Sequence, residues 1–244
     1  MSEISQVLGV FTKNIKDHTG AGATLQRSES KTFYYVTRSG VDTYHAQPLN
    51  KQNIPSGLVI TLTKKEFITQ FTPELKYYEK KTLPALKSLK DKLDKGEKNF
   101  MSGNLDEAEQ SFAKALFLDP ENPRANLGMG SVQCSKNNFD KLSKIISKLL
   151  NNDSVFMERQ RHEFNLFAIS LRKESLFEEA ITFYNRAIEI NPNDENLHFN
   201  AARAYFDAGD FDNALSHLDE ALEVSPELGV ASMFKKYIIK RLDK

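Results

Sequence analysis

Disulfide bonds and long apolar runs are both missing from this sequence. It contains one cysteine, Cys134, so no internal disulfide bond can form, which is typical of proteins in a reducing compartment. No stretch approaches the roughly 18 consecutive apolar residues of a membrane-spanning helix. The first residues, MSEISQVLGVF, lack the basic start and long apolar run of a signal peptide. We therefore expect a cytoplasmic protein with no membrane partner.

An excess of one charge is missing as well. The chain of 244 residues holds 33 Lys and Arg against 33 Asp and Glu. Residues 1–88 carry 12 basic and 7 acidic side chains, and residues 89–244 carry 21 and 26. Nucleic-acid-binding domains usually show a strongly basic patch, which this mild asymmetry does not provide. We therefore expect no nucleic-acid partner.

The common motifs of catalytic and metal sites are also absent. The glycines of HTGAGATLQ, residues 18–26, lack the lysine of a phosphate loop and the third glycine of a dinucleotide site, so they predict only a loop between strands. No two of the five histidines stand at metal-ligand spacing on a helix, and neither GxSxG nor HExxH occurs. We expect Cys134 to be a small helix residue, His198 to pack inside and His217 to be exposed. The sequence predicts no catalytic residue, no metal ligand, no cofactor and no enzyme.

What the chain does contain is a pattern of 34 residues that recurs. AGDFDNALSHLDEALEVSP, at 208–226, places the same kinds of residue at the same steps as ESLFEEAITFYNRAIEINP, at 174–192. Two antiparallel helices cross closely where both carry small residues, here Ala202 and Ala214, while bulky residues at three- and four-residue spacing fill the rest of the face. The proline after each second helix ends that helix. The pattern predicts pairs of packed helices.

This pattern resembles the tetratricopeptide repeat, a helix–turn–helix unit. The resemblance implies a right-handed α-solenoid over residues 89–228. Together with the small β domain expected before it, this predicts a mainly α protein of class α+β. Its four copies would be 89–122, a degenerate 123–156, 161–194 and 195–228, with Met157–Gln160 inserted after the second. Residues 229–244 are expected to form a capping helix. The apolar face of this helix, which would pack on the array, is Val230, Met233, Phe234, Tyr237 and Ile238. Its solvent-exposed face would be Lys235, Lys236, Lys240 and Arg241.

The start of the chain has another character. Within residues 1–72, the runs QVLGVF, GATLQR, KTFYYVTR, VDTYHAQ and GLVITLT predict a small antiparallel domain of four or five strands, with a hairpin turn at Ser39-Gly40. The capping box of Thr63 and Glu66 predicts a helix that carries Phe67, Ile68 and Phe71. Residues 73–88 are expected to be a helical linker that Pro73 opens and Pro84 breaks or kinks. This layout resembles uncharacterised tetratricopeptide proteins of Desulfovibrio-type bacteria, which implies a bacterial protein of no known activity.

By the same resemblance, the first helices of the copies line a concave groove. The predicted partner-binding residues are basic, aromatic or amide side chains with one leucine: Arg124, Leu127, Asn165, Arg172, Lys173, Phe199, Arg203 and Phe206. Such a groove suits a peptide or protein segment with a carboxylate and apolar side chains. In a plainer interpretation the face is solvated, and Phe199 and Phe206 only pack between repeats.

Two functions follow from this layout. The first is a non-enzymatic scaffold or adaptor that binds a protein or peptide in the groove. The alternative is a sensor, in which the N-terminal β domain binds a small molecule or nucleotide and the repeats relay its presence. The sequence leaves the partner, the oligomeric state and the main binding face open.

Overall fold

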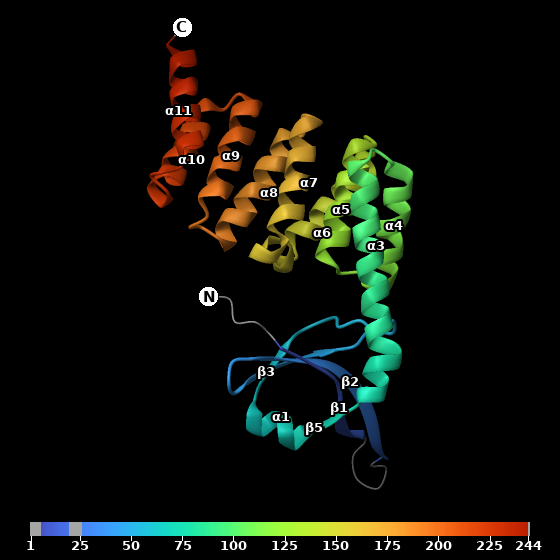
Figure 1. Ribbon diagram of the computed structural model, residues 1–244. Coiled ribbons are helices and arrows are strands. Elements are labelled where there is room, and N and C mark those ends of the chain that lie inside the picture. The colour runs from blue at the N-terminus through green and yellow to red at the C-terminus, as the bar shows by residue number, and fades with distance from the viewer. Residues whose placement is uncertain (1–5, 20–25, 244) are drawn as a thin grey trace. The chain divides into compact units, whose positions relative to one another are not determined.

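The computed structural model describes residues 6–19 and 26–243 (Figure 1). The chain divides into two compact units, one made of the residues up to 94 together with 114–121, the other of 95–113 and 122–244. Within the described ranges, no helix is both long and apolar enough to cross a membrane. The observed class is α+β and mainly helical, which confirms the predicted fold class.

The first unit contains one antiparallel sheet of five strands in the order β4-β3-β2-β1-β5. Its strands are β1 Gln6–Thr19, β2 Gln26–Ser39, β3 Thr43–Pro48, β4 Ile60–Thr63 and β5 Phe71–Pro73. The turn after Ser39 joins β2 to β3, as predicted. The expected separate strand GATLQR is wrong where it can be followed, because Gln26 and Arg27 belong to β2, while residues 22–25 lie outside the described residues.

Helix α1, Lys64–Gln70, covers one face of the sheet. Its capping box is confirmed: the Thr63 hydroxyl accepts from the Glu66 amide at 3.3 Å, and the Glu66 carboxylate accepts from the Thr63 amide at 2.8 Å. Phe67 stacks on Tyr44 with ring centroids 4.5 Å apart. The prediction that Phe71 belongs to this helix is wrong, because Phe71 has extended backbone, begins β5 and pairs with β1.

The other face of the sheet is covered by the helical segment that follows β5. This segment consists of α2 Leu75–Tyr77 and a π-helical turn Tyr78–Thr82, and α3 Leu83–Met101 continues the chain after it. Tyr77 stacks on Phe33 at 4.1 Å. The prediction that Pro73 opens a helix is wrong, because Pro73 ends β5. Pro84 does not break the helix either: it lies in α3 directly after the wider π turn, which accommodates the missing N–H and the crowding of the ring on the preceding turn.

The second unit is an array of antiparallel helix pairs, which Figure 1 shows as successive neighbours. After the end of α3, its helices are α4 Leu105–Leu118, α5 Pro123–Ser135, α6 Phe139–Leu150, α7 Arg161–Lys173, α8 Phe177–Ile190, α9 Glu195–Ala208, α10 Phe211–Val224 and α11 Gly229–Leu242. Two short 3-10 helices, Asp153–Phe156 and Glu158–Gln160, fill the junction between α6 and α7.

The packing of the array follows the small residues. Ala202 and Ala214 are completely buried in one apolar cluster where α9 and α10 meet. The turn between these two helices needs Gly209, whose φ of +85° lies in the left-handed region that side chains disfavour. His198 is buried, as predicted. The prediction that His217 is exposed is wrong, because His217 is half-buried and its ring stacks on Tyr205 at 5.2 Å.

Candidate functional site

Helices α7 and α9 carry most of the predicted groove residues. Asn165 on α7 and Asn200 on α9 are joined by a hydrogen bond of 3.4 Å from the Asn200 amide to Asn165 Oδ1. Lys173 is exposed at the end of α7. On α9, the guanidinium of Arg203 is exposed and lies 5.9 Å from the ring centroid of the half-buried Phe199. These residues remain accessible on one side of the array.

Two predicted residues of α5 are not available in the same way. Leu127 is completely buried in the core with Phe167, so the prediction that it contacts a partner is wrong. Arg124 is held inside the chain: its Nη2 donates to both carboxylate oxygens of Glu97 at 2.6 and 2.7 Å, and its Nε lies 3.3 Å from Glu163. Leu127 follows the apolar pattern of its own helix, and that core role takes precedence over its repeat position.

Arg172 is also engaged by its own chain. Its Nε donates to Asp207 Oδ2 at 2.9 Å, and only 10% of its side chain is exposed. Of the three predicted cations of α7 and α9, only Lys173 and Arg203 therefore remain available to a partner. The spacing of the two residues in the sequence is consistent with this ion pair. Asp207 stands 35 residues after Arg172, which is one repeat and one further residue. It therefore lies on α9 at almost the position that Arg172 has on α7.

Phe206 packs between helices. Its ring lies 5.5 Å from Phe211 on α10, and 5.2 Å from Phe234 and 5.9 Å from Tyr237 on α11. The plainer interpretation therefore holds for Phe206, which helps to seat the last helix. The rings of Phe199 and Phe234 also pack edge to face, with their centroids 6.2 Å apart.

The apolar stripe expected on α11 divides into two parts. Ala231 and Ile238 are buried and Phe234 is half-buried against the array. Three other apolar side chains are instead 48%, 66% and 53% exposed: Val230, Met233 and Tyr237. The prediction that all of the stripe faces the array is therefore wrong.

A shift of one repeat explains this division. On α11, Val230, Met233 and Tyr237 stand one repeat of 34 residues after Asn196, Phe199 and Arg203 of α9, and the last two of these are predicted groove residues. The same helical spacing places them on the groove side of α11. The sequence analysis missed them because it treated the last helix only as a cap.

A cleft of about 440 Å³ lies between α9 and α11. It is lined by Phe199, Arg203, Val230, Met233 and Phe234. Among the residues that the structure describes, no carboxylate forms an ion pair with Arg203. The cleft therefore combines an apolar surface with one uncompensated guanidinium, a pairing that can hold an apolar side chain beside a carboxylate.

A buried hydroxyl lies close to the same guanidinium groups. Tyr184 on α8 is completely buried, and its hydroxyl has no hydrogen-bond partner in the described part of the chain. Burial raises the pKa of this phenol to about 12, against the opposing effect of the positive charges of Arg172 and Arg203. The hydroxyl therefore keeps its proton at neutral pH and can act as a donor.

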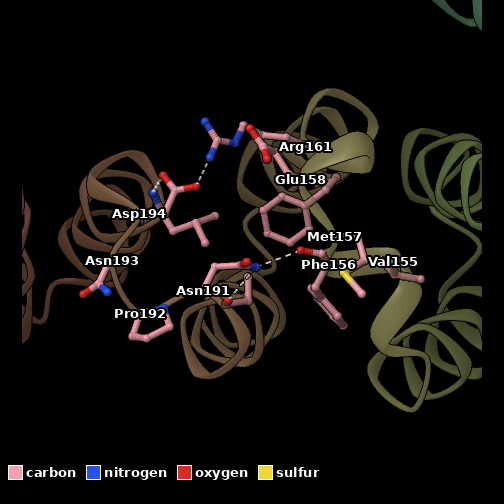
Figure 2. A pocket seen from close by; sticks show the side chains of 12 residues that line it. Val155, Phe156, Met157, Glu158, Arg161, Asn191, Pro192, Asn193 and Asp194 are labelled. Atoms are coloured by element: carbon pink, nitrogen blue, oxygen red, sulfur yellow. Dashed lines mark hydrogen bonds and ion pairs between the residues drawn. The ribbon is translucent and has the colours of Figure 1, made fainter. Parts of the chain in front are cut away.

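Another hollow, of about 330 Å³, lies at the junction between α6 and α7 and at the turn between α8 and α9 (Figure 2). Arg161 forms an ion pair with Asp194, and the Asn191 amide donates to the Phe156 carbonyl at 2.8 Å. Asp194 also accepts from the amide of Asn196 at 3.0 Å, as the N-cap of α9. These contacts tie the inserted segment to the next turn, so the polar groups here already serve the fold.

Residues with possible redox or metal chemistry are not grouped. Across residues 6–19 and 26–243, no cluster of three or more His, Cys, Asp or Glu could hold a metal ion. Cys134 is buried, as predicted, and burial raises the pKa of its thiol to about 12, with a further contribution from Glu174 and Glu179. The thiol is therefore not an activated nucleophile.

The chain is similar in sequence to mammalian aspartyl/asparaginyl beta-hydroxylases. Human aspartyl/asparaginyl beta-hydroxylase is 26% identical over 186 residues, which cover 70% of this chain and 24% of that protein. The chain thus spans about a quarter of the length of this curated relative. The activity in that name belongs to the whole hydroxylase and is not carried over by a match of this extent.

Solved structures with a similar arrangement include two bacterial proteins. MamA from Desulfovibrio magneticus has a TM-score of 0.47 and 14% identity, over 64% of this chain and 86% of that one. PilF from Pseudomonas aeruginosa has a TM-score of 0.49 and 16% identity, over 64% and 70%. Both likenesses are too low to carry an argument about function, so the predicted bacterial origin stays a prediction.

A family model matches the chain directly. Residues 171–232 match the tetratricopeptide repeat model, and this stretch runs from the end of α7 into α11. It includes the crossing alanines of α9 and α10 and the turn at Gly209. The family match, the paired helices and their small crossing residues together show that residues 171–232 carry tetratricopeptide repeats.

Proposed function

We propose that this protein is a non-enzymatic scaffold that binds a peptide or protein segment on the concave side of its repeats, chiefly in the cleft between α9 and α11. Tetratricopeptide repeats support an interaction role in general. The observation that carries the specific proposal is that the exposed apolar side chains of Val230 and Met233 line the same cleft as Arg203. A helix that only capped the array would not need apolar side chains on this side.

The chemistry of the cleft defines the segment that fits it. Met233 and Phe199 offer a polarisable apolar surface for an aliphatic or aromatic side chain. Arg203 offers a charge-assisted bond to a carboxylate, which contributes about 1.5–3 kcal/mol. Lys173 and the exposed Lys236 and Lys240 of α11 add long-range attraction for an acidic segment. The partner is therefore an acidic segment with one or two apolar anchors.

The test begins with partners isolated by full-length protein and continues with point variants. Arg203→Ala should weaken binding at least about tenfold, because the charged bond is lost. Met233→Asp should weaken it as strongly, because it places a negative charge on the apolar surface beside an acidic segment. Lys235→Ala, on the same helix but paired with Asp219 on α10, is the matched control and should bind normally.

Isothermal titration of each purified variant gives the answer, with the melting midpoint as a check on folding. If a captured partner binds both Arg203→Ala and Met233→Asp as tightly as wild type, the cleft is not the binding face. A partner that binds through the sheet of the first unit would then favour the sensor or a different scaffold face.

A further inference from the structure

A third, smaller hollow lies between α3, α4, α5 and α7. We call it the Glu163 socket, after the acidic residue at its edge. Phe100 and Met101 from α3, Phe112 from α4 and Leu166 from α7 form its apolar lining. Its volume is about 60 Å³, which at roughly 10–15 Å³ per water is enough for the end of one long side chain.

The polar lining of the socket consists of the carboxylates of Glu97 and Glu163, the guanidinium of Arg124, and the side chains of Ser131 and His162. The guanidinium of Arg124 donates hydrogen bonds from Nη2 to both carboxylate oxygens of Glu97. Glu163 receives only the longer contact of 3.3 Å from Arg124 Nε to its Oε1. In the described ranges, no donor reaches its second oxygen, Oε2. Apart from His162, the two carboxylates and one guanidinium carry a formal net charge of −1.

This carboxylate is poorly compensated for its burial. The side chain of Glu163 is only 16% exposed. A buried charge without a full set of partners is costly, and a cation beside it recovers part of that cost. The apolar lining below suits the methylene stem that carries such a cation in Lys or Arg.

We propose that the Glu163 socket binds the cationic side chain of a bound segment. The proposal rests on the scaffold function above and extends it to the sign of the partner's charges. The segment then carries a basic residue over α5 and α7 and a carboxylate over α9. With about 8–10 Å between neighbouring helices, the two charges lie roughly five or six extended residues apart.

Natural methionines report on each hollow separately. Met101 lines the socket, Met233 lines the cleft between α9 and α11, and the half-exposed Met157 lines neither. Full-length protein with ¹³C-labelled methionine methyl groups is titrated with N-acetyl-arginine amide. The neutral isostere N-acetyl-citrulline amide is the matched control probe. Weak millimolar affinities suffice for this measurement.

The expected result is a saturable shift of the Met101 signal with the arginine probe and a response at least about threefold weaker with the citrulline probe. Glu163→Gln should abolish the difference between the two probes without changing the Met157 signal. Equal responses to both probes in wild type, or no Met101 response at all, overturn the proposal. The comparison of probes in wild type needs no variant, so a folding defect in Glu163→Gln does not obscure it.

The design separates this proposal from the scaffold proposal. N-acetyl-aspartyl-leucine amide should shift Met233 through Arg203 and leave Met101 unmoved. If Met233 responds and Met101 does not respond to the arginine probe, the cleft stands and the socket proposal is wrong. If Met101 responds and captured partners ignore the Arg203 and Met233 variants, the socket stands and the cleft proposal is wrong.

Discussion

Phe112 occupies the space that a side chain on Gly128 would need. A Cβ placed on Gly128 would lie 2.3 Å from Phe112 Cζ, and one placed on Gly96 would lie 2.7 Å from Phe112 Cε1. The ring thus passes between two helices at glycines and reaches the Glu163 socket. The backbone at Gly96 and at Gly128 lies close to the ring and holds it in place on both sides.

Gly128→Ala should therefore overpack this crossing. We expect a loss of about 1–3 kcal/mol in the free energy of unfolding, because Phe112 is 1% exposed and its ring lies directly against Gly128. Urea denaturation followed by circular dichroism measures the change. Gly229→Ala is the matched control, because a Cβ there meets nothing within 4 Å. A Gly128→Ala protein as stable as this control would show that the ring does not lie between the helices.

The repeat array could be predicted because its determinants are periodic. Ala202, Ala214 and Gly209 each recur in kind one or more repeats away, so their packing roles can be recognised from spacing alone. Phe71 and Pro84 were harder. Apolar spacing at Phe71 also fits an amphipathic helix, and only the pairing of β5 with β1 decides for a strand. The π turn ahead of Pro84 has no sequence signal of its own.

The site could be predicted less well because side-chain pairing across the array is not periodic. The groove positions were deduced one helix at a time, which gave no means to see that Arg172 meets Asp207 or that Arg124 meets Glu97. Both pairs neutralise cations that the sequence analysis left free. Met233 was missed for the opposite reason, since a residue outside the counted repeats continues their groove.

The pair of Arg172 and Asp207 should contribute to stability across neighbouring repeats. Arg172 is nearly buried, so its ion pair is less screened by water than a surface pair. A double-mutant cycle with Arg172→Ala and Asp207→Ala should give a coupling of about 0.5–3 kcal/mol. The exposed pair of Arg186 and Glu189 within α8 is the control and should couple more weakly. A coupling no larger than that of the control would mean that the interaction adds nothing to the repeat interface.

Cys134 should be chemically silent in the folded protein. It is completely buried, and its pKa is raised to about 12, so almost no thiolate is present at neutral pH. Iodoacetamide followed by mass spectrometry should find no adduct on the native chain and complete labelling in denaturant. Native labelling at the denatured rate would show that the α5 region opens freely.

His198 and His217 form a contact that should respond to pH. His198 Nε2 lies 2.9 Å from the Pro192 carbonyl, which can only accept, so this nitrogen carries the proton and Nδ1 is left as an acceptor. His217 Nδ1, at 3.3 Å, must then be the donor. Burial lowers the pKa of His217, and the neighbouring His198 lowers it further, while Glu220 opposes both.

The sign of the pH effect follows from this lowered pKa. Below the ordinary histidine value of 6.5, the unfolded chain binds a proton that the folded chain resists, so the free energy of unfolding falls as the pH falls. Between about pH 8 and about pH 5, wild type should therefore lose more stability than His217→Gln, as measured by urea denaturation at each pH. His162→Gln, which removes an exposed histidine of α7, is the control and should follow wild type. Equal losses in wild type and His217→Gln would show that the contact between α9 and α10 does not resist protonation.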